Sequence, residues 1–276
     1  MTQLAPGSAD AVPAGTSAHA DPLRAGELGR AWGVSPVIAQ LLLDRGVGGV
    51  GQRDAERFLF PKLAHLTVPD AMADRALAAQ RIAHAIRRRE RIVVFGDYDV
   101  DGTTSATILS DIIERLGGDV VALVGNRFSG GYGLSDAALA RVLAERPRLL
   151  VTCDCGSSDH ARVERARGAG VDVIVVDHHL VPAQPLPALA FLNPHRPECA
   201  FPYKGLCSAG LALSLGAALR AELKAGLDLR QWLDLVALGT IADVAPLDGD
   251  NRALVRAGLA TLAGGPRPGI RALAEV

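Results

Sequence analysis

The sequence predicts an α/β protein built on a parallel, five-stranded sheet that is flanked by helices. Five short runs rich in Val, Leu and Ile alternate with helical stretches, at residues 91–95, 119–124, 148–153, 171–176 and 188–193. The runs are continuously apolar, as in strands that are buried on both faces. Because helices separate the first four runs, the strands must be joined by crossovers, which produce parallel pairing.

The segments before and after the sheet are predicted to be helical or disordered. Residues 1–22 are small, polar and Pro-containing, so we expect a disordered tail. Residues 23–68 form a helical lead, in which Ser35 is placed to cap a helix with Pro36 in its first turn and Gly46 at its end. Residues 69–276 form the main domain. Its expected helices cover residues 74–91, 103–118, 134–145 and 159–170, and a long helical segment runs from Cys207 to about Leu262.

Composition and charge restrict the class of protein. The net charge is −1 and the pI about 6.7, so no overall positive field indicates a nucleic-acid partner, although a local patch would suffice. The chain has no apolar run of about 18 residues and no secretory leader pattern. We therefore expect a cytoplasmic protein with no membrane contact. Its four cysteines are expected to be reduced thiols, as is usual in the cytosol, and they lack the spacing of a zinc knuckle.

Three carboxylates follow the first predicted strand in the segment "VVFGDYDVDGTTS". Asp97, Asp99 and Asp101 stand at every second position, with Gly102 after them. Uncompensated carboxylates within about 7 Å raise one another's pKa and disfavour ionisation, so such a group usually implies a bound cation. The pattern matches the first half of a calcium-binding EF-hand loop, but Ile108 stands where that loop needs a bidentate Glu, and a strand precedes it.

Two other motifs, for phosphate binding and for dinucleotide binding, are excluded by the residues around them. No Gly-Lys-Ser/Thr follows the aspartates, which excludes a Walker loop. The segment "RGVGGVG" fits G-x-G-x-x-G through Gly46, Gly48 and Gly51, but a helix precedes it. A dinucleotide-binding loop must follow a strand, so these glycines are better explained as a helix terminator.

Polar side chains also follow the other predicted strands. Asp154 follows the third strand, Asp177, His178 and His179 follow the fourth, and Asn193 closes the fifth. In open α/β sheets, ligands bind beyond the carboxyl ends of the strands. Mixed Asp and His ligation without cysteine suits Mn²⁺ or Mg²⁺, and two such ions about 3.5–4 Å apart would share a bridging Asp and activate water for phosphoryl transfer.

The two adjacent histidines point in different directions at a strand end. We therefore expect one of them to bind metal and the other to face the substrate, with Asp177 orienting its neighbours.

Six segments occur in the order seen in one family: "GDYDVDGTTS", "NRFSGGYGLS", "VTCDCGSSDH", "VIVVDHH", "LNPH" and "DLVALGTIADVAPLDGDNRALV". In these the chain resembles the DHH phosphoesterase superfamily, and within it the RecJ-like exonucleases specific for single-stranded DNA. The resemblance runs from about Leu23 to the C-terminus and includes "RPGIRAL" at 267–273. It implies a Rossmann-like sheet for the DHH domain. It also implies hydrolysis of DNA in the 5′ to 3′ direction, in repair and recombination, with two Mn²⁺ or Mg²⁺ ions.

The resemblance also implies roles for individual residues. Asp99, Asp101, Asp154, His178 and Asp243 look like metal ligands, with Asp154 as the bridging carboxylate, whereas Asp97 is either a ligand or an orienting group. Asp154, Asp177 and His179 form the catalytic set. His179 would contact the scissile phosphate, and Arg127 would grip a phosphate. Gly131 and Gly133 would let the backbone approach that phosphate.

The chain departs from the family pattern in three places. Gly125 stands where relatives often carry Pro, and "CSAGLALSL" lacks a Lys often found near its end. We also expect the family's second, glycine-rich nucleic-acid-binding domain (DHHA1-type) and its oligonucleotide-binding barrel (OB domain) to be absent from these 276 residues.

Three functions therefore remain open from the sequence. The first is a RecJ-like exonuclease, with single-stranded DNA and a single-strand-binding protein as partners. The second is a phosphoesterase for short oligonucleotides or small nucleotides. The third is a non-catalytic module that binds nucleic acid or a replication partner.

Overall fold

The computed structural model describes residues 22–47, 55–128 and 131–276, and these belong to two compact units, Met1–Pro61 and Lys62–Val276. The first unit contains helices α1 (Pro22–Trp32), α2 (Pro36–Asp44) and α3 (Ala55–Leu59). Ser35 caps α2 as predicted, because its hydroxyl accepts a hydrogen bond from the Ile38 N–H at 3.3 Å. The predicted tail, apart from Pro22, and the glycines at 48 and 51 lie outside the described residues. The domain boundaries stay predictions.

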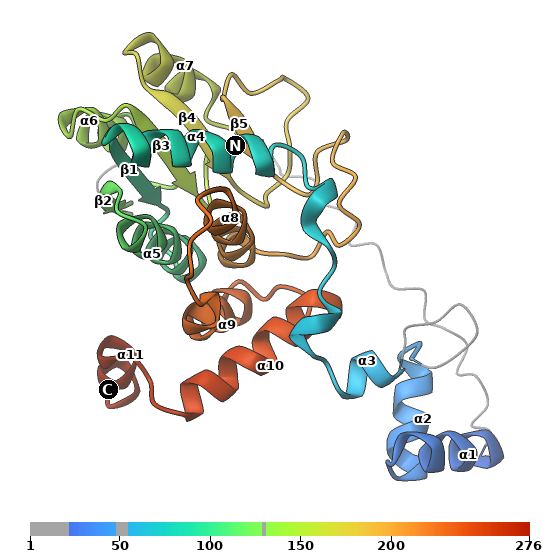
Figure 1. The fold of residues 1–276 in the computed structure, drawn as a ribbon. Coiled ribbons are helices and arrows are strands. Elements are labelled where there is room, and N and C mark those ends of the chain that lie inside the picture. Colours follow the sequence, from blue (N-terminus) through green and yellow to red (C-terminus); the bar gives the residue numbers. More distant parts are fainter. Residues whose placement is uncertain (1–21, 48–54, 129–130) are drawn as a thin grey trace. The chain divides into compact units, whose positions relative to one another are not determined.

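The second unit contains the predicted parallel sheet. Its strands are β1 (Arg91–Gly96), β2 (Asp119–Val124), β3 (Leu149–Cys153), β4 (Asp172–Val176) and β5 (Ala190–Leu192). All four strand pairs are parallel, in the order β2-β1-β3-β4-β5 (Figure 1). The five-stranded parallel sheet predicted from the sequence is therefore confirmed.

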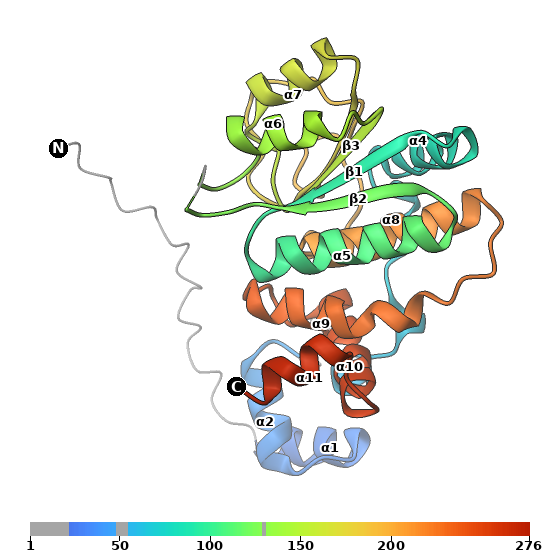
Figure 2. The ribbon, with the colours of Figure 1, turned by 90° about the vertical axis from the view of Figure 1, so that its left-hand side faces the viewer.

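Helices cover both faces of this sheet (Figure 2). On one face lie α4 (Arg75–Arg88), α5 (Val100–Arg115) and α8 (Ser208–Glu222), and on the other lie α6 (Asp136–Ala144) and α7 (His160–Gly168). Each face has its own buried apolar cluster, so the strands are buried on both sides as their sequence indicated.

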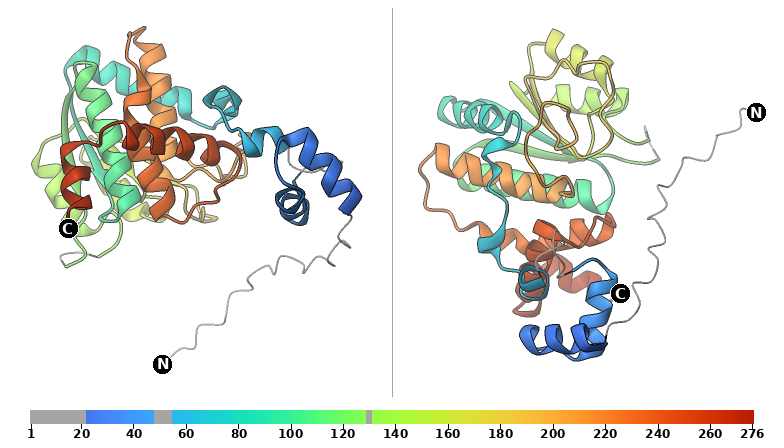
Figure 3. Two further views of the ribbon diagram at one scale, coloured as in Figure 1. Left: turned by 90° about the horizontal axis from the view of Figure 1, so that it is seen from below. Right: turned by 90° about the vertical axis from the view of Figure 1, so that its right-hand side faces the viewer.

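A further helical layer packs on α5 and α8 (Figure 3). It contains α9 (Leu233–Ala242) and α10 (Gly249–Ala263), and α11 (Pro268–Ala274) follows near the end of the chain. Short 3-10 turns lie at Leu63–His65, Pro69–Ala71 and Leu229–Trp232. Across the described ranges, every helix is too short or too polar to span a lipid bilayer.

The strand register aligns the polar residues that follow the strands. Gly96, Cys153, Val176 and Leu192 occupy one level of the sheet. At the next level, the Asp97 N–H donates to the Cys153 carbonyl at 3.2 Å, and the Asp154 N–H to that of Val176 at 2.9 Å. The Asp177 N–H donates to the Leu192 carbonyl at 3.0 Å, which completes what we call the aspartate row, Asp97, Asp154 and Asp177.

The aspartate row lies at a switch in strand order, because β2 pairs with one edge of β1 and the next strand, β3, pairs with the opposite edge of β1. This is where open α/β sheets bind ligands.

Helix α5 begins at Val100, three residues before the predicted start at 103. Asp99 caps it, accepting the Gly102 N–H at 2.8 Å, so the first turn includes Asp101. A Cβ on Gly96 would lie 2.3 Å from the Gly102 carbonyl oxygen, and one on Gly102 would lie 2.6 Å from the Asp97 backbone. Only glycine at both positions lets the helix start lie against the end of β1.

Candidate metal centre

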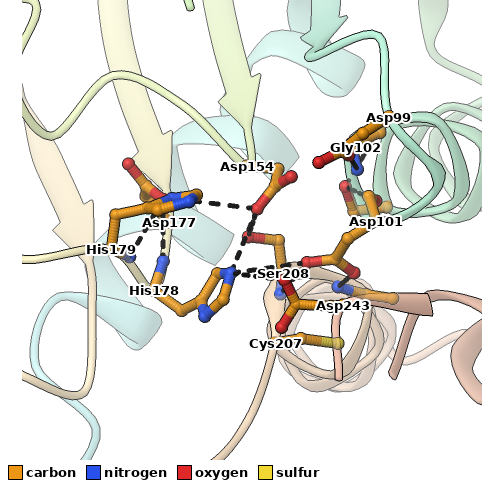
Figure 4. Close-up of polar contacts among 12 residues, drawn as sticks. Asp99, Asp101, Gly102, Asp154, Asp177, His178, His179, Cys207, Ser208 and Asp243 are labelled. Carbon is orange, nitrogen blue, oxygen red and sulfur yellow. Dashed lines mark hydrogen bonds and ion pairs between the residues drawn. The ribbon is translucent and has the colours of Figure 1, made fainter. Parts of the chain in front are cut away.

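The cluster of carboxylates and imidazoles gathers around His178 (Figure 4). Its Nε2 atom lies 3.2 Å from Asp154 Oδ1, 3.7 Å from Asp101 Oδ2 and 3.7 Å from Asp243 Oδ1. Donor atoms of Asp101, His178 and Asp243 lie within 4.8 Å of one another, as do those of Asp154, His178 and His179. The two groups share His178, so four segments distant in the sequence supply one cluster.

Asp154 contributes to this cluster from a strained backbone conformation. Its φ is 63°, in the left-handed region that non-glycine residues rarely adopt, and such strain is often found at functional sites. Its side chain is 1% exposed. Burial, followed by the charges of Asp101 and Asp99, raises the pKa of Asp154 to about 10. Burial and the neighbouring carboxylates thus disfavour the ionised form, and a cation held here would offset that cost.

The N-terminus of α8 holds two of the carboxylates. The Ser208 and Ala209 N–H groups donate to Asp101 at 2.7 and 2.9 Å, and the Ser208 hydroxyl donates to Asp154 Oδ1 at 3.0 Å. The sequence indicated only that a helical segment begins near Cys207, so the role of Ser208 was missed. The small residues of "CSAG" were the only available signal, and they do not specify which side chains the helix start meets.

The cluster leaves buried polar atoms that fit a divalent cation. Among the described residues, Asp97 Oδ2, Asp154 Oδ2 and His178 Nε2 make no hydrogen bond. His178 Nε2 is within ion-pair distance of Asp154, but the angle is wrong for a hydrogen bond. Unsatisfied buried groups of this kind are costly. Because carboxylate oxygens and an imidazole nitrogen are standard ligands for Mn²⁺, the donor set fits that ion.

Asp177 and His179 form a hydrogen-bonded pair beside the cluster. Asp177 Oδ1 accepts from His179 Nδ1 at 2.7 Å and from the His178 N–H at 2.8 Å, and its Oδ2 accepts from the Ser157 N–H at 3.0 Å. Burial alone would raise the pKa of Asp177, but the hydrogen bonds from His179 and Ser157 more than offset it and the pKa falls to about 2. The hydrogen bond to Asp177 in turn raises the pKa of His179.

Two further side chains fix His179, and the sequence identified neither contact. The Tyr132 hydroxyl lies 3.1 Å from His179 Nε2 and 3.3 Å from the Asp154 carbonyl oxygen. The Asn193 amide donates to the His179 carbonyl at 2.8 Å. The sequence places Asn193 at the end of its strand, whereas in the segment that holds Tyr132 it assigns roles only to Arg127, Gly131 and Gly133.

The other predicted site residues lie around the cluster. Asp97 is fully buried, its Oδ1 accepts the Gly133 N–H at 3.2 Å, and it belongs to neither of the two donor groups. Gly131 and Gly133 have φ values of 79° and 76°, a conformation that favours glycine. Arg127 stacks on the Tyr98 ring, with its guanidinium carbon 4.7 Å from the ring centroid.

Comparisons with known proteins identify the family. Residues 91–240 match the model of the DHH family, N-terminal domain. The chain belongs to the DHH family. This DHH chain is 46% identical over 212 residues to the single-stranded-DNA-specific exonuclease RecJ of Dickeya dadantii and 35% identical over 244 residues to that of Bacillus subtilis. These matches cover 72% and 88% of the chain, but only 37% and 30% of the relatives.

Solved structures of relatives have the same fold. RecJ of Thermus thermophilus in complex with Mn²⁺ superposes with a TM-score of 0.74 at 35% identity, covering 92% of this DHH chain and 35% of that protein. A crystal structure of exonuclease RecJ bound to manganese gives a TM-score of 0.67 at 39% identity, covering 74% of the chain and 52% of that protein.

Proposed function

We propose that the chain is the catalytic domain of a RecJ-like exonuclease, which hydrolyses single-stranded DNA from the 5′ end with Mn²⁺ or Mg²⁺. The observation that carries the proposal is the set of donors from Asp101, Asp154, His178 and Asp243, in which Asp154 Oδ2 and His178 Nε2 are buried atoms without a hydrogen-bond partner that a cation would satisfy. Relatives described as single-stranded-DNA-specific exonucleases, one of them in complex with Mn²⁺, support it.

We assign the metal ligands from the two donor groups. Asp101, His178 and Asp243 would hold one ion. Asp154, which lies with His178 and His179 in the other group, would be the carboxylate shared between two ions, with Asp99 beside it. Asp97 is the sixth candidate, as a ligand through its unpaired Oδ2 or as an orienting group. Divalent ions held here supply positive charge that acidifies water and stabilises the charge developing on a phosphodiester.

The protein's own groups would position the substrate. The bond from His179 Nδ1 to the ionised Asp177 leaves Nε2 as the nitrogen that would face the scissile phosphate. The Tyr132 hydroxyl lies beside the same ring, 3.2 Å from Nδ1 and 3.1 Å from Nε2. The raised pKa of His179 favours the protonated ring, which donates to an anionic oxygen. Arg127 would bind a neighbouring phosphate, and the glycines at 131 and 133 would let backbone N–H groups approach it.

The proposed partner is single-stranded DNA, with a single-strand-binding protein as a second partner in repair and recombination. The four cysteines are free and buried, which suits the reducing cytoplasm where such a reaction would take place.

Substrate length tests the proposal against its alternatives. Hydrolysis of a 5′-labelled single strand of about 50 nucleotides is compared with hydrolysis of a 5-mer and of a blunt duplex, in Mn²⁺ and over a range of salt. A single-strand exonuclease shortens the long strand from its 5′ end, spares the duplex, and loses activity steeply with salt on the long strand alone. Faster turnover of the 5-mer would instead support a phosphoesterase for short oligonucleotides. Absence of hydrolysis of any substrate would leave a non-catalytic binding module.

A further inference from the structure

A cavity lies at one end of the aspartate row, where β2 ends. Val124 pairs with Gly96, so Gly125 follows at the level of Asp97, and its N–H donates to the Gly96 carbonyl at 2.9 Å. A Cβ on Gly125 would lie 3.2 Å from Asp97 Oδ1. The cavity of about 560 Å³ next to this position is lined by residues 124–128, Tyr98 and Arg141. We call it the β2 pocket.

The β2 pocket is positively charged. It contains two guanidinium groups, those of Arg127 and Arg141, and its lining includes no carboxylate. Arg141 donates to the Val124 carbonyl at 3.0 Å, which ties it to the end of β2. Within the described residues no acidic side chain pairs with either guanidinium. The charge is therefore available for an anion that lies beside the metal cluster.

The β2 pocket also offers aromatic surface. The Arg127 guanidinium stacks on the Tyr98 ring, and the Phe128 ring is 93% exposed. The Asn126 side-chain oxygen accepts the Phe128 N–H at 2.9 Å, which fixes the backbone that presents this ring. An exposed aromatic ring beside a stacked guanidinium is the combination on which nucleobases stack in single-strand-binding sites.

We propose that the β2 pocket binds a nucleobase of the strand whose phosphodiester lies at the aspartate row. Phe128 stacks on the base, Tyr98 holds Arg127 in place, and the two guanidinium groups neutralise the flanking phosphates. The inference rests on the proposed function, and it adds that the domain recognises bases as well as backbone. A free phosphate would use the arginines but not the exposed ring, and the volume suits a nucleoside.

Binding of strands with and without bases tests the proposal. Fluorescence anisotropy is measured for a labelled ten-nucleotide oligo(dT) and for a ten-unit abasic strand, in Ca²⁺ with strand integrity checked on a gel. We expect the wild-type chain to bind oligo(dT) about tenfold more tightly than the abasic strand. Phe128→Ala brings this ratio close to one, and Phe128→Tyr retains it. Phe60→Ala, which removes a half-exposed ring elsewhere in the chain, leaves the ratio unchanged.

Arg127→Ala separates charge from stacking. It weakens the binding of both strands by a similar factor, because both carry the same phosphates. Equal affinity of the wild-type chain for the two strands would overturn the proposal, as would a Phe128→Ala variant that keeps the preference. Failure of the proposed function has a different signature: base-dependent binding would persist while Mn²⁺-dependent hydrolysis is absent.

Discussion

Removal of the Ser208 hydroxyl is predicted to weaken Mn²⁺ binding without unfolding the domain. Ser208 is fully buried, and its hydroxyl donates to Asp154 Oδ1 at 3.0 Å while Oδ2 has no partner among the described residues. The bond therefore fixes the orientation of the carboxylate, whose Oδ1 lies 3.2 Å from His178 Nε2, and leaves Oδ2 available to the proposed ion. Loss of a hydrogen bond to a charged group costs about 1.5–3 kcal/mol, which corresponds to roughly 10- to 100-fold in affinity.

The measurement is Mn²⁺ titration by isothermal calorimetry of the wild-type chain and Ser208→Ala, with circular dichroism to verify the fold. Ser110→Ala is the matched control, because the Ser110 hydroxyl donates only within its own helix, to the Ala106 carbonyl at 2.8 Å and that of Thr107 at 3.2 Å. We expect weaker binding in Ser208→Ala and unchanged binding in the control. If Ser208→Ala binds Mn²⁺ as tightly as the wild type, the argument that Ser208 positions Asp154 is wrong.

Two further predictions concern packing and thiol chemistry. Gly258→Ala should lower the free energy of unfolding, measured in urea, by about 1–3 kcal/mol, because the new Cβ would lie 2.1 Å from the Leu233 carbonyl oxygen. Gly168→Ala should not lower it, because the new Cβ would have no atom within 4 Å. Equal unfolding midpoints for the two variants would refute the packing of α9 on α10. The folded chain should not react with a disulfide reagent at pH 8, because its cysteines are buried and burial raises the pKa of the Cys155 and Cys207 thiols. All four cysteines should react once the chain is unfolded in guanidinium. Fast labelling of the folded chain would contradict the structure.

Local sequence patterns were sufficient for the sheet and for the residues that follow its strands. The strands are continuous apolar runs, and a parallel register must bring the residues after them to one edge. Asp97, Asp154 and Asp177 therefore could be placed together from the sequence alone. Asp101, His178 and Asp243 do lie together in the structure, but Asp243 was included only because the chain resembles a known family.

Contacts made by segments distant in the sequence could not be predicted. Ser208 and Tyr132 reach the cluster from the start of α8 and from the loop after β2, and no periodic pattern reveals which side chains those segments meet. The start of α5 was placed too late, because Asp and Gly are poor helix formers. Capping by Asp99 and the close approach of Gly102 to β1 outweigh that preference.

The most direct test of a metal-dependent phosphodiesterase is the hydrolysis of a 5′-labelled single-stranded oligonucleotide by the wild-type chain and Asp154→Asn, side by side, in Mn²⁺ and in EDTA. We expect hydrolysis by the wild type in Mn²⁺ alone. We expect Asp154→Asn to keep the circular dichroism spectrum of the wild type but to lose activity to the level of the EDTA control. Hydrolysis by Asp154→Asn at the wild-type rate, or wild-type hydrolysis that persists in EDTA, would contradict this expectation.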